Sequence, residues 1–195
     1  MVIKPFRFIG GALCLDFVNT VGGWTDGGVV RDKLRGPEDL ARWGEIVGNA
    51  PALTPWGWKS VFRKAISLRS ALHEIFQSAI ERRAPADEHM EILNRVLKAA
   101  RTHERIAFVG REFRREVEDS PDAILWAVAL SAEDLLTSDM LRDLRQCPGV
   151  DCGWMFLDAS RNGLRQWCDM RICGNRAKAR AFREKQRKHY SRGFR

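Results

Sequence analysis

The residues best suited to chemistry are four cysteines in the last third of the chain. They form two C-x4-C pairs, Cys147 with Cys152 and Cys168 with Cys173, with fifteen residues between the pairs. Zn²⁺ in structural sites is held tetrahedrally, often by four thiolates at about 2.3 Å, which leaves no open position for a substrate. The spacing therefore predicts a structural zinc site on these four residues. Two disulfides, or buried cysteines without a metal, remain as alternatives.

The predicted zinc site would need a small module around it. A Pro-Gly pair inside the first C-x4-C suits a turn, and Asn162-Gly163, between the two pairs, favours a tight hairpin. Trp154, Phe156 and Trp167 would form a miniature apolar core. Such a module is too small to fold on packing alone, so the metal would supply the missing free energy. We expect its core to be separate from that of the preceding domain.

A basic segment follows the last cysteine. Residues 174–195 contain nine Lys or Arg and a single acid, Glu184, which gives a net charge of +8, and the preceding residues hold 24 basic and 24 acidic side chains. All of the excess charge therefore lies in this segment, which predicts a local polyanion-binding element. The segment has high helix propensity, and Asn175 can cap the helix.

The cations of this predicted helix are not arranged at random. Four arginines fall at i, i+4, i+7 and i+11 and share one face, whereas a solvated face usually mixes signs. Ala179 and Phe182 lie on another side, where they could pack onto the zinc module. The arginines could contact backbone phosphates or read guanine edges, and the sequence does not separate these roles. We assign DNA binding to five residues: Arg176, Lys178, Arg180, Arg183 and Arg187.

The residues before the cysteines are predicted to be mainly helical. Apolar side chains recur at helical spacing over 59–83, and further helices are predicted to begin at Pro37, near Asp87 and after Asp122. Alternating polarity about Gly110 predicts a short β-hairpin over 105–117. Residues 12–18 fit a helix or a strand. The predicted fold class is mainly α: a helical N-terminal bundle with a short β-hairpin, plus a small C-terminal zinc-binding module made of a β-hairpin and a basic helix.

Composition also predicts the domain organisation and the compartment. It changes from apolar-helical to Cys, Trp and basic near 137–141, which predicts a helix-rich domain over 1–140 and a zinc module over 141–195. No apolar run approaches about 18 residues, and the N-terminus lacks the pattern of a signal peptide. We therefore expect no membrane association and a reducing cytoplasm, where clustered cysteines are more often metal ligands than disulfides.

A second candidate site lies near the N-terminus. Asp16, Asn19 and Thr20 place three polar groups beside an apolar run and a glycine-rich loop, and with Trp24 they could line a ligand pocket. Hydrogen bonding within turns and caps is the alternative, and we favour it.

An enzymatic function is weakly supported. His73, His89 and His103 lie on predicted helices at no metal-ligand spacing, and no nucleophile motif accompanies them. We therefore expect no catalytic residues and no enzymatic activity.

The run CPGVDCGWMFLDASRNGLRQWCDMRICGNRAKAR, over 147–180, resembles the CGNR zinc finger, which is named for the motif at 173–176. Upstream, LCLDFVNT and the helix-rich stretch after it resemble the ABATE domain. The resemblance implies a bacterial, stress-induced transcription regulator with a mainly α N-terminal bundle, zinc on the four cysteines and DNA binding by the finger.

The leading functional hypothesis is a DNA-binding transcription regulator whose structural zinc module presents the basic helix to DNA. Its N-terminal domain would sense a small-molecule effector or mediate assembly into an oligomer. The alternative, from another class, is a zinc-dependent adaptor that binds RNA or an acidic protein partner. An enzyme housed in the N-terminal domain comes last.

Overall fold

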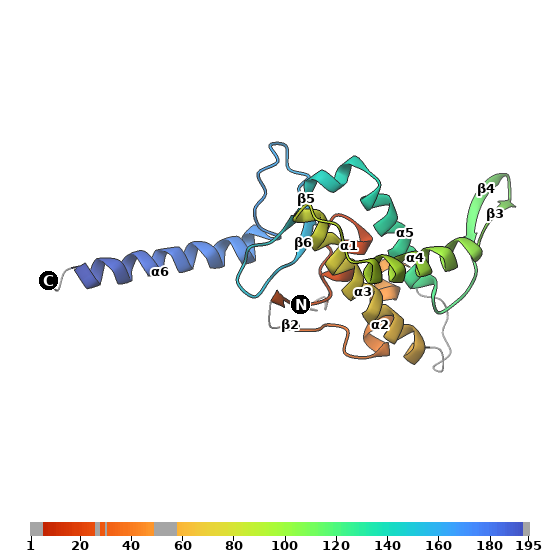
Figure 1. Ribbon diagram of the computed structural model, residues 1–195, viewed down its shortest axis with the longest axis horizontal. Coiled ribbons are helices and arrows are strands. Elements are labelled where there is room, and N and C mark those ends of the chain that lie inside the picture. The colour runs from red at the N-terminus through yellow and green to blue at the C-terminus, as the bar shows by residue number, and fades with distance from the viewer. Residues whose placement is uncertain (1–5, 26–27, 30, 49–57, 193–195) are drawn as a thin grey trace.

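The computed structural model describes residues 6–25, 28–29, 31–48 and 58–192. Its N-terminal part is a bundle of helices: α1 (Leu13–Val18), α2 (Pro37–Val47), α3 (Trp58–Ile80), α4 (Asp87–Thr102) and α5 (Ala123–Leu136) (Figure 1). The mainly helical class is confirmed, and 12–18 resolves as a helix. No helix in the described part of the chain is both long and apolar enough to cross a membrane.

Local sequence explains where these helices begin and end. Pro37 stands in the first turn of α2, where its fixed φ suits a helix and its missing N–H is not needed. The helix stops at Gly48, which adopts the left-handed conformation with φ of 74°. Asp87 and Glu88 lie in the first turn of α4, where carboxylates favour the positive end of the helix dipole.

Helix α5 is apolar nearly all round, and half of its residues are buried. It packs against α4, α1 and α3. The main core also draws on the C-terminal part, since Leu144, Met155 and Leu157 belong to the same buried cluster as the helices. The expectation of separate cores was therefore wrong in part: the cysteines have a buried cluster of their own, but β5 and β6 also belong to the main core. Side chains of the β5–β6 hairpin point alternately to its two faces. The face with Leu144, Met155 and Leu157 completes the core of the bundle.

Two small antiparallel pairs complete the N-terminal part. Strands β1 (Trp24–Thr25) and β2 (Gly28–Val29) form the first. Strands β3 (Glu104–Val109) and β4 (Glu112–Val117) form the predicted hairpin about Gly110, with Phe108 opposite Phe113. This hairpin projects from the bundle beyond α4 (Figure 1), and most of its side chains are exposed.

The C-terminal part contains a hairpin, but the predicted position was wrong. After η1 (Asp139–Asp143), strands β5 (Leu144–Gln146) and β6 (Met155–Leu157) pair across the first C-x4-C. Asn162-Gly163 does form a turn, closed by Gly163 N–H and Ser160 O at 3.1 Å, but no strands flank it. A side-chain hydrogen bond, not pairing of strands, closes this loop. The carboxylate of Asp158 accepts the backbone N–H of Arg165 at 3.0 Å.

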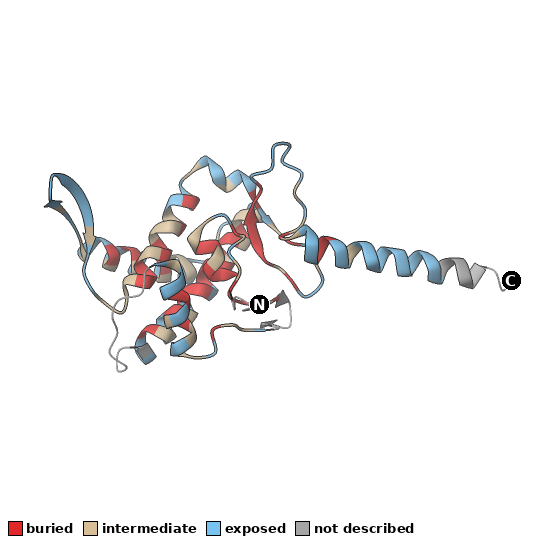
Figure 2. Ribbon diagram, turned by 180° about the vertical axis from the view of Figure 1, so that it is seen from behind, coloured by how far each residue is buried: buried red, intermediate tan, exposed pale blue. Residues whose placement is uncertain are grey.

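The last two described elements are η2 (Met170–Gly174), which is a turn of π-helix, and α6 (Asn175–Arg192). Helix α6 extends away from the body (Figures 1 and 2) and contacts η2. Phe182 is 62% exposed and Ala179 is exposed, so their predicted packing onto the zinc module was wrong. Asn175 is not an N-cap either. Helical backbone begins five residues earlier, where the carboxylate of Asp169 accepts the N–H groups of Arg171 and Ile172.

Candidate metal centre and basic helix

The sulfurs of Cys147, Cys152, Cys168 and Cys173 converge within 4.8 Å of one another, and all four residues are buried. Sγ of Cys168 lies 3.5 Å from that of Cys152 and 3.6 Å from that of Cys173. A tetrahedron with zinc–sulfur bonds of about 2.3 Å has sulfur–sulfur edges of about 3.8 Å, so the cluster has the size of a zinc site. All five cysteines of the chain are free thiols, which sets the disulfide alternative aside.

Two structural elements bring the sulfurs together. The first pair lies on the turn between β5 and β6, and the second pair leads into and ends η2. Gly149 permits the close approach, because a Cβ there would lie 3.2 Å from Sγ of Cys173 and 3.4 Å from Sγ of Cys147. A Cβ at Gly174, the second residue of the CGNR motif, would meet Sδ of Met170 at 2.4 Å, so a side chain there would require Met170 to move.

The chemistry of the donor set also suits a divalent cation. With protons alone, hydrogen bonds from the thiols of Cys152 and Cys168 lower the pKa of Cys147 to about 2. The same hydrogen bonds raise the pKa of Cys152 to about 12 and raise that of Cys168, while burial raises that of Cys173. Zinc would be held by all four thiolates, and it would supply structural stability.

A small aromatic cluster surrounds the sulfurs. Trp154 and Phe156 are buried with the four cysteines, and Trp167 packs against them, which confirms the predicted apolar cluster. The structure adds Ile9, from the segment before α1, and a guanidinium: Cζ of Arg165 stands 4.3 Å from the centre of the Phe156 ring. The cluster is therefore completed by a residue far away in sequence.

Side-chain contacts of Asn19, Trp154 and Arg7 tie the module to the rest of the chain. The side chain of Asn19 donates to Met155 O at 2.8 Å and accepts from Met155 N–H at 2.9 Å. The indole of Trp154 donates to Val21 O at 2.5 Å. Arg7 forms an ion pair with Asp169, whose pKa is lowered: burial would raise it, but hydrogen bonds from Arg7 and from backbone N–H groups outweigh burial.

The predicted ligand-pocket residues make internal hydrogen bonds. Asp16 accepts the backbone N–H groups of Ile9 and Gly10 at 2.9 and 2.8 Å, and burial raises its pKa. Thr20, 1% exposed, donates to a backbone oxygen of α1 at 2.7 Å. With Asn19 bound to Met155, these are turn, cap and anchoring contacts. The side chain of Trp24 lies outside the described residues, and a ligand role for the set stays a prediction.

The five cations assigned to DNA binding all lie on the outward-pointing α6. Arg176, Lys178, Arg180, Arg183 and Arg187 are exposed, and none of them forms an ion pair with a described residue. Arg176, in the first turn, also lines a cavity bordered by Cys152, Cys168 and Cys173. The structure therefore leaves this charge available to a partner.

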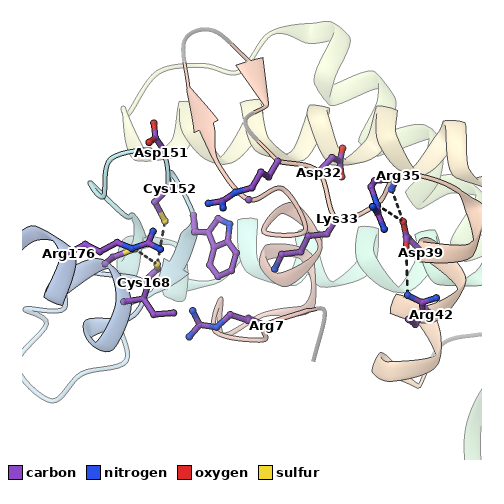
Figure 3. Close-up of a pocket in the computed structure, with 15 residues that line it drawn as sticks. Arg7, Asp32, Lys33, Arg35, Asp39, Arg42, Asp151, Cys152, Cys168 and Arg176 are labelled. Atoms are coloured by element: carbon purple, nitrogen blue, oxygen red, sulfur yellow. Dashed lines mark hydrogen bonds and ion pairs between the residues drawn. The ribbon is translucent and has the colours of Figure 1, made fainter. Parts of the chain in front are cut away.

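Sequence reasoning missed a second basic site. A cavity of about 550 Å³ lies beside the metal centre and is bordered by Cys152, Trp154, Arg7, Lys33 and Arg176, among others (Figure 3). Its cations come from segments far apart in sequence. The only local signal in the sequence was the segment RDKLR at 31–35, in which every second residue is a cation. Whether such a segment forms a binding site depends on which residues pack beside it in the folded chain.

This combination defines a class: a protein with a helical N-terminal domain and a zinc finger of the CGNR type. Residues 143–186 match the sequence model of the CGNR zinc finger. Residues 11–139, more than half of the chain, match that of the ABATE family, described as "Putative stress-induced transcription regulator", and the chain belongs to this family. None of the curated proteins searched matches the chain.

Proposed function

We propose that this protein is a DNA-binding transcription regulator in which the zinc centre holds the first turn of α6 and presents the rest of the helix to DNA. The observation that carries the proposal is the state of α6: its described side chains include one acid among many cations, those from 178 to 187 are all exposed, and its first turn follows the four-cysteine cluster. Family membership supports the regulatory role.

The dimensions and charge of α6 suit a DNA groove. At about 1.5 Å per residue, its eighteen residues extend about 27 Å. The major groove of B-DNA is about 12 Å wide and admits an α-helix. The stripe of Arg176, Arg180, Arg183 and Arg187 lies within one face, and Lys178 lies on the opposite face, so that cations would approach both walls of a groove.

The isolation of α6 is itself an argument for a partner. Most helical stability in proteins comes from packing an apolar face, and a helix of this length is marginal in water without it. Among the side chains described from 178 to 187, all are exposed. A polyanion that neutralises the arginines would supply the missing stabilisation, and the metal centre would fix the direction of the helix.

The remaining parts of the proposal concern the body of the protein. We take the helix-rich domain (1–140) as the part that senses a small effector or mediates assembly, and 141–195 as the DNA-binding module. The hydrogen bonds of Asn19 and Trp154 to backbone across this boundary would carry a change in one part to the other. Such a regulator would act in the cytoplasm, where thiols stay reduced.

The test is the salt dependence of DNA binding by zinc-loaded protein, on sites selected from random duplexes. Each phosphate contact contributes a slope of about −0.9 in log affinity against log salt. The triple variant Arg180→Ala, Arg183→Ala, Arg187→Ala should therefore lose about 2.7 of slope if each arginine contacts a phosphate. Arg176 is kept because it also borders the cavity.

A charge-matched control separates position from net charge. Lys59, Arg63 and Lys98 are exposed on α3 and α4, and their joint change to Ala removes the same three charges. This control should keep nearly the wild-type slope. Equal slopes for wild type and the α6 variant would refute the proposal, and preference for single-stranded RNA over every duplex would support the adaptor alternative instead.

A further inference from the structure

The cavity beside the metal centre gathers cations from three separate parts of the chain. Arg7 comes from the segment before α1, Arg31 and Lys33 from the segment before α2, and Arg176 from the first turn of α6. Figure 3 shows Cys152, Cys168 and Arg176 at one end, Asp39 and Arg42 at the other, and Arg7 and Lys33 between them. The volume of about 550 Å³ lies within the range of small-molecule sites, about 300–1,000 Å³.

The carboxylates near the cavity do not balance these cations. Asp39 is shared by Arg35 at 3.6 Å and Arg42 at 3.7 Å. Asp32 stands between Arg31 and Lys33 in the sequence. Its two carboxylate oxygens accept hydrogen bonds from the buried guanidinium of Arg69, one of them at 2.8 Å. Asp151 is the third carboxylate of the lining, and Arg7 also pairs with Asp169 outside it. The lining therefore sets six cations against three carboxylates.

Arg31 and Lys33 are the cations left over. Neither forms an ion pair with a described residue. Nζ of Lys33 instead lies 4.7 Å from the centre of the Trp154 ring, with Cζ of Arg7 5.9 Å from the same centre. Burial, and then the charges of Arg7 and Arg31, lower the pKa of Lys33. A zinc ion with four thiolates would carry a net charge of −2, and Cys152 and Cys168 lie at the Arg176 end of the cavity, away from Arg42 (Figure 3).

The segment that carries Arg31 and Lys33 is held in place on both sides. Lys33 N–H donates to Thr20 O at 3.0 Å, and Arg31 O accepts from Gly22 N–H. Leu34 is buried, and its N–H donates to the Asp32 carboxylate at 2.8 Å. The backbone that carries these cations is therefore fixed before any ligand arrives, which lowers the entropy lost on binding.

We propose that this cavity binds a small molecule bearing two or more phosphate groups, of about the size of a nucleotide. The phosphates would lie between Lys33, Arg31 and Arg7, where charge-assisted hydrogen bonds to ammonium and guanidinium groups are available. The inference rests on the proposed function for its meaning, because it identifies the class of the effector. Arg176 and three of the zinc ligands border the same space, so that a ligand there would contact the base of α6.

The first experiment is calorimetric titration of the zinc-loaded full chain with ADP and with pyrophosphate, in low salt and without DNA. Adenosine, which lacks the charge, should not bind. The Lys33→Gln variant should bind ADP at least about tenfold more weakly, since it loses a charge-assisted hydrogen bond. Lys98→Gln, which removes an exposed lysine of α4 far from the cavity in sequence, should bind as the wild type does. No binding of either probe to wild type, or equal binding by Lys33→Gln, would overturn the proposal.

The second experiment separates this site from the DNA interface. The triple arginine variant of α6 should keep the wild-type affinity for ADP, and Lys33→Gln should keep the salt slope of DNA binding. If Lys33→Gln lowers that slope by about one while ADP does not bind, the cavity contacts the DNA backbone and the effector proposal is wrong. If ADP binds and wild type binds no duplex, the cavity proposal stands and the DNA-binding proposal fails.

Discussion

Replacing Asn19 by Ala should destabilise the whole protein, although the residue lies in the helical domain and the change is small. Asn19 is 1% exposed, and its amide satisfies both backbone groups of Met155, at 2.8 and 2.9 Å. Removing the amide leaves a buried N–H and a buried C=O without that partner, at about 1–3 kcal/mol each. We expect a loss of about 4 kcal/mol in the free energy of unfolding.

The assay is urea unfolding of zinc-loaded protein, followed by far-ultraviolet circular dichroism and by tryptophan fluorescence. Thermal melting of the same variant offers a second measurement: for a chain of this length, about 4 kcal/mol corresponds to a fall in Tm of roughly 8–16 °C. Both probes should shift together, because Met155 lies in the core that the helices share. Asn94→Ala, at an exposed position of α4, is the matched control and should stay within about 0.5 kcal/mol of wild type.

The result that refutes this reasoning is an Asn19→Ala variant as stable as the control variant. In that case the amide would not anchor the module, and a ligand role for Asn19 would regain support. A shift in the fluorescence transition alone would also contradict the shared core, because only the zinc module would then have been weakened.

Three further results are expected. Purified reduced protein should hold one zinc per chain by elemental analysis, and Cys168→Ser should lose it and unfold the helices at lower urea, because β5 and β6 contribute to their core. Burial raises the pKa of Cys14 from 9.0 to about 12, so the folded chain retains a proton that the unfolded chain releases, and stability falls as pH rises through this range. Between pH 8 and 10, wild type should lose about 1.4 kcal/mol more than Cys14→Ala in urea unfolding. Asp169→Asn should lower stability by about 1 kcal/mol at pH 7 through loss of its cap and its pairing with Arg7, and the difference from wild type in melting experiments should shrink below about pH 4.

Much of this protein could be predicted from local pattern. The helices beginning at Pro37 and near Asp87 and the hairpin about Gly110 follow from signals within a few residues of each element. The metal centre could be predicted too, because four cysteines in 27 residues need only short turns to converge. These features depend on periodicity, turn residues and ligand spacing, which neighbouring residues determine.

Other features depended on residues distant in sequence. The turn at Asn162-Gly163 has hairpin chemistry, yet the strands pair elsewhere, because Leu144, Met155 and Leu157 gain more by joining the helical core. Asn19 suggested a ligand pocket, and only the position of Met155, 136 residues later, shows which groups its amide satisfies. The cavity was invisible for the same reason: Arg7 and Lys33 are ordinary surface residues in one dimension, and the sequence assigned Arg176 to the basic helix alone. Burial and charge balance are properties of the whole packed chain, and the tertiary structure alone decides them.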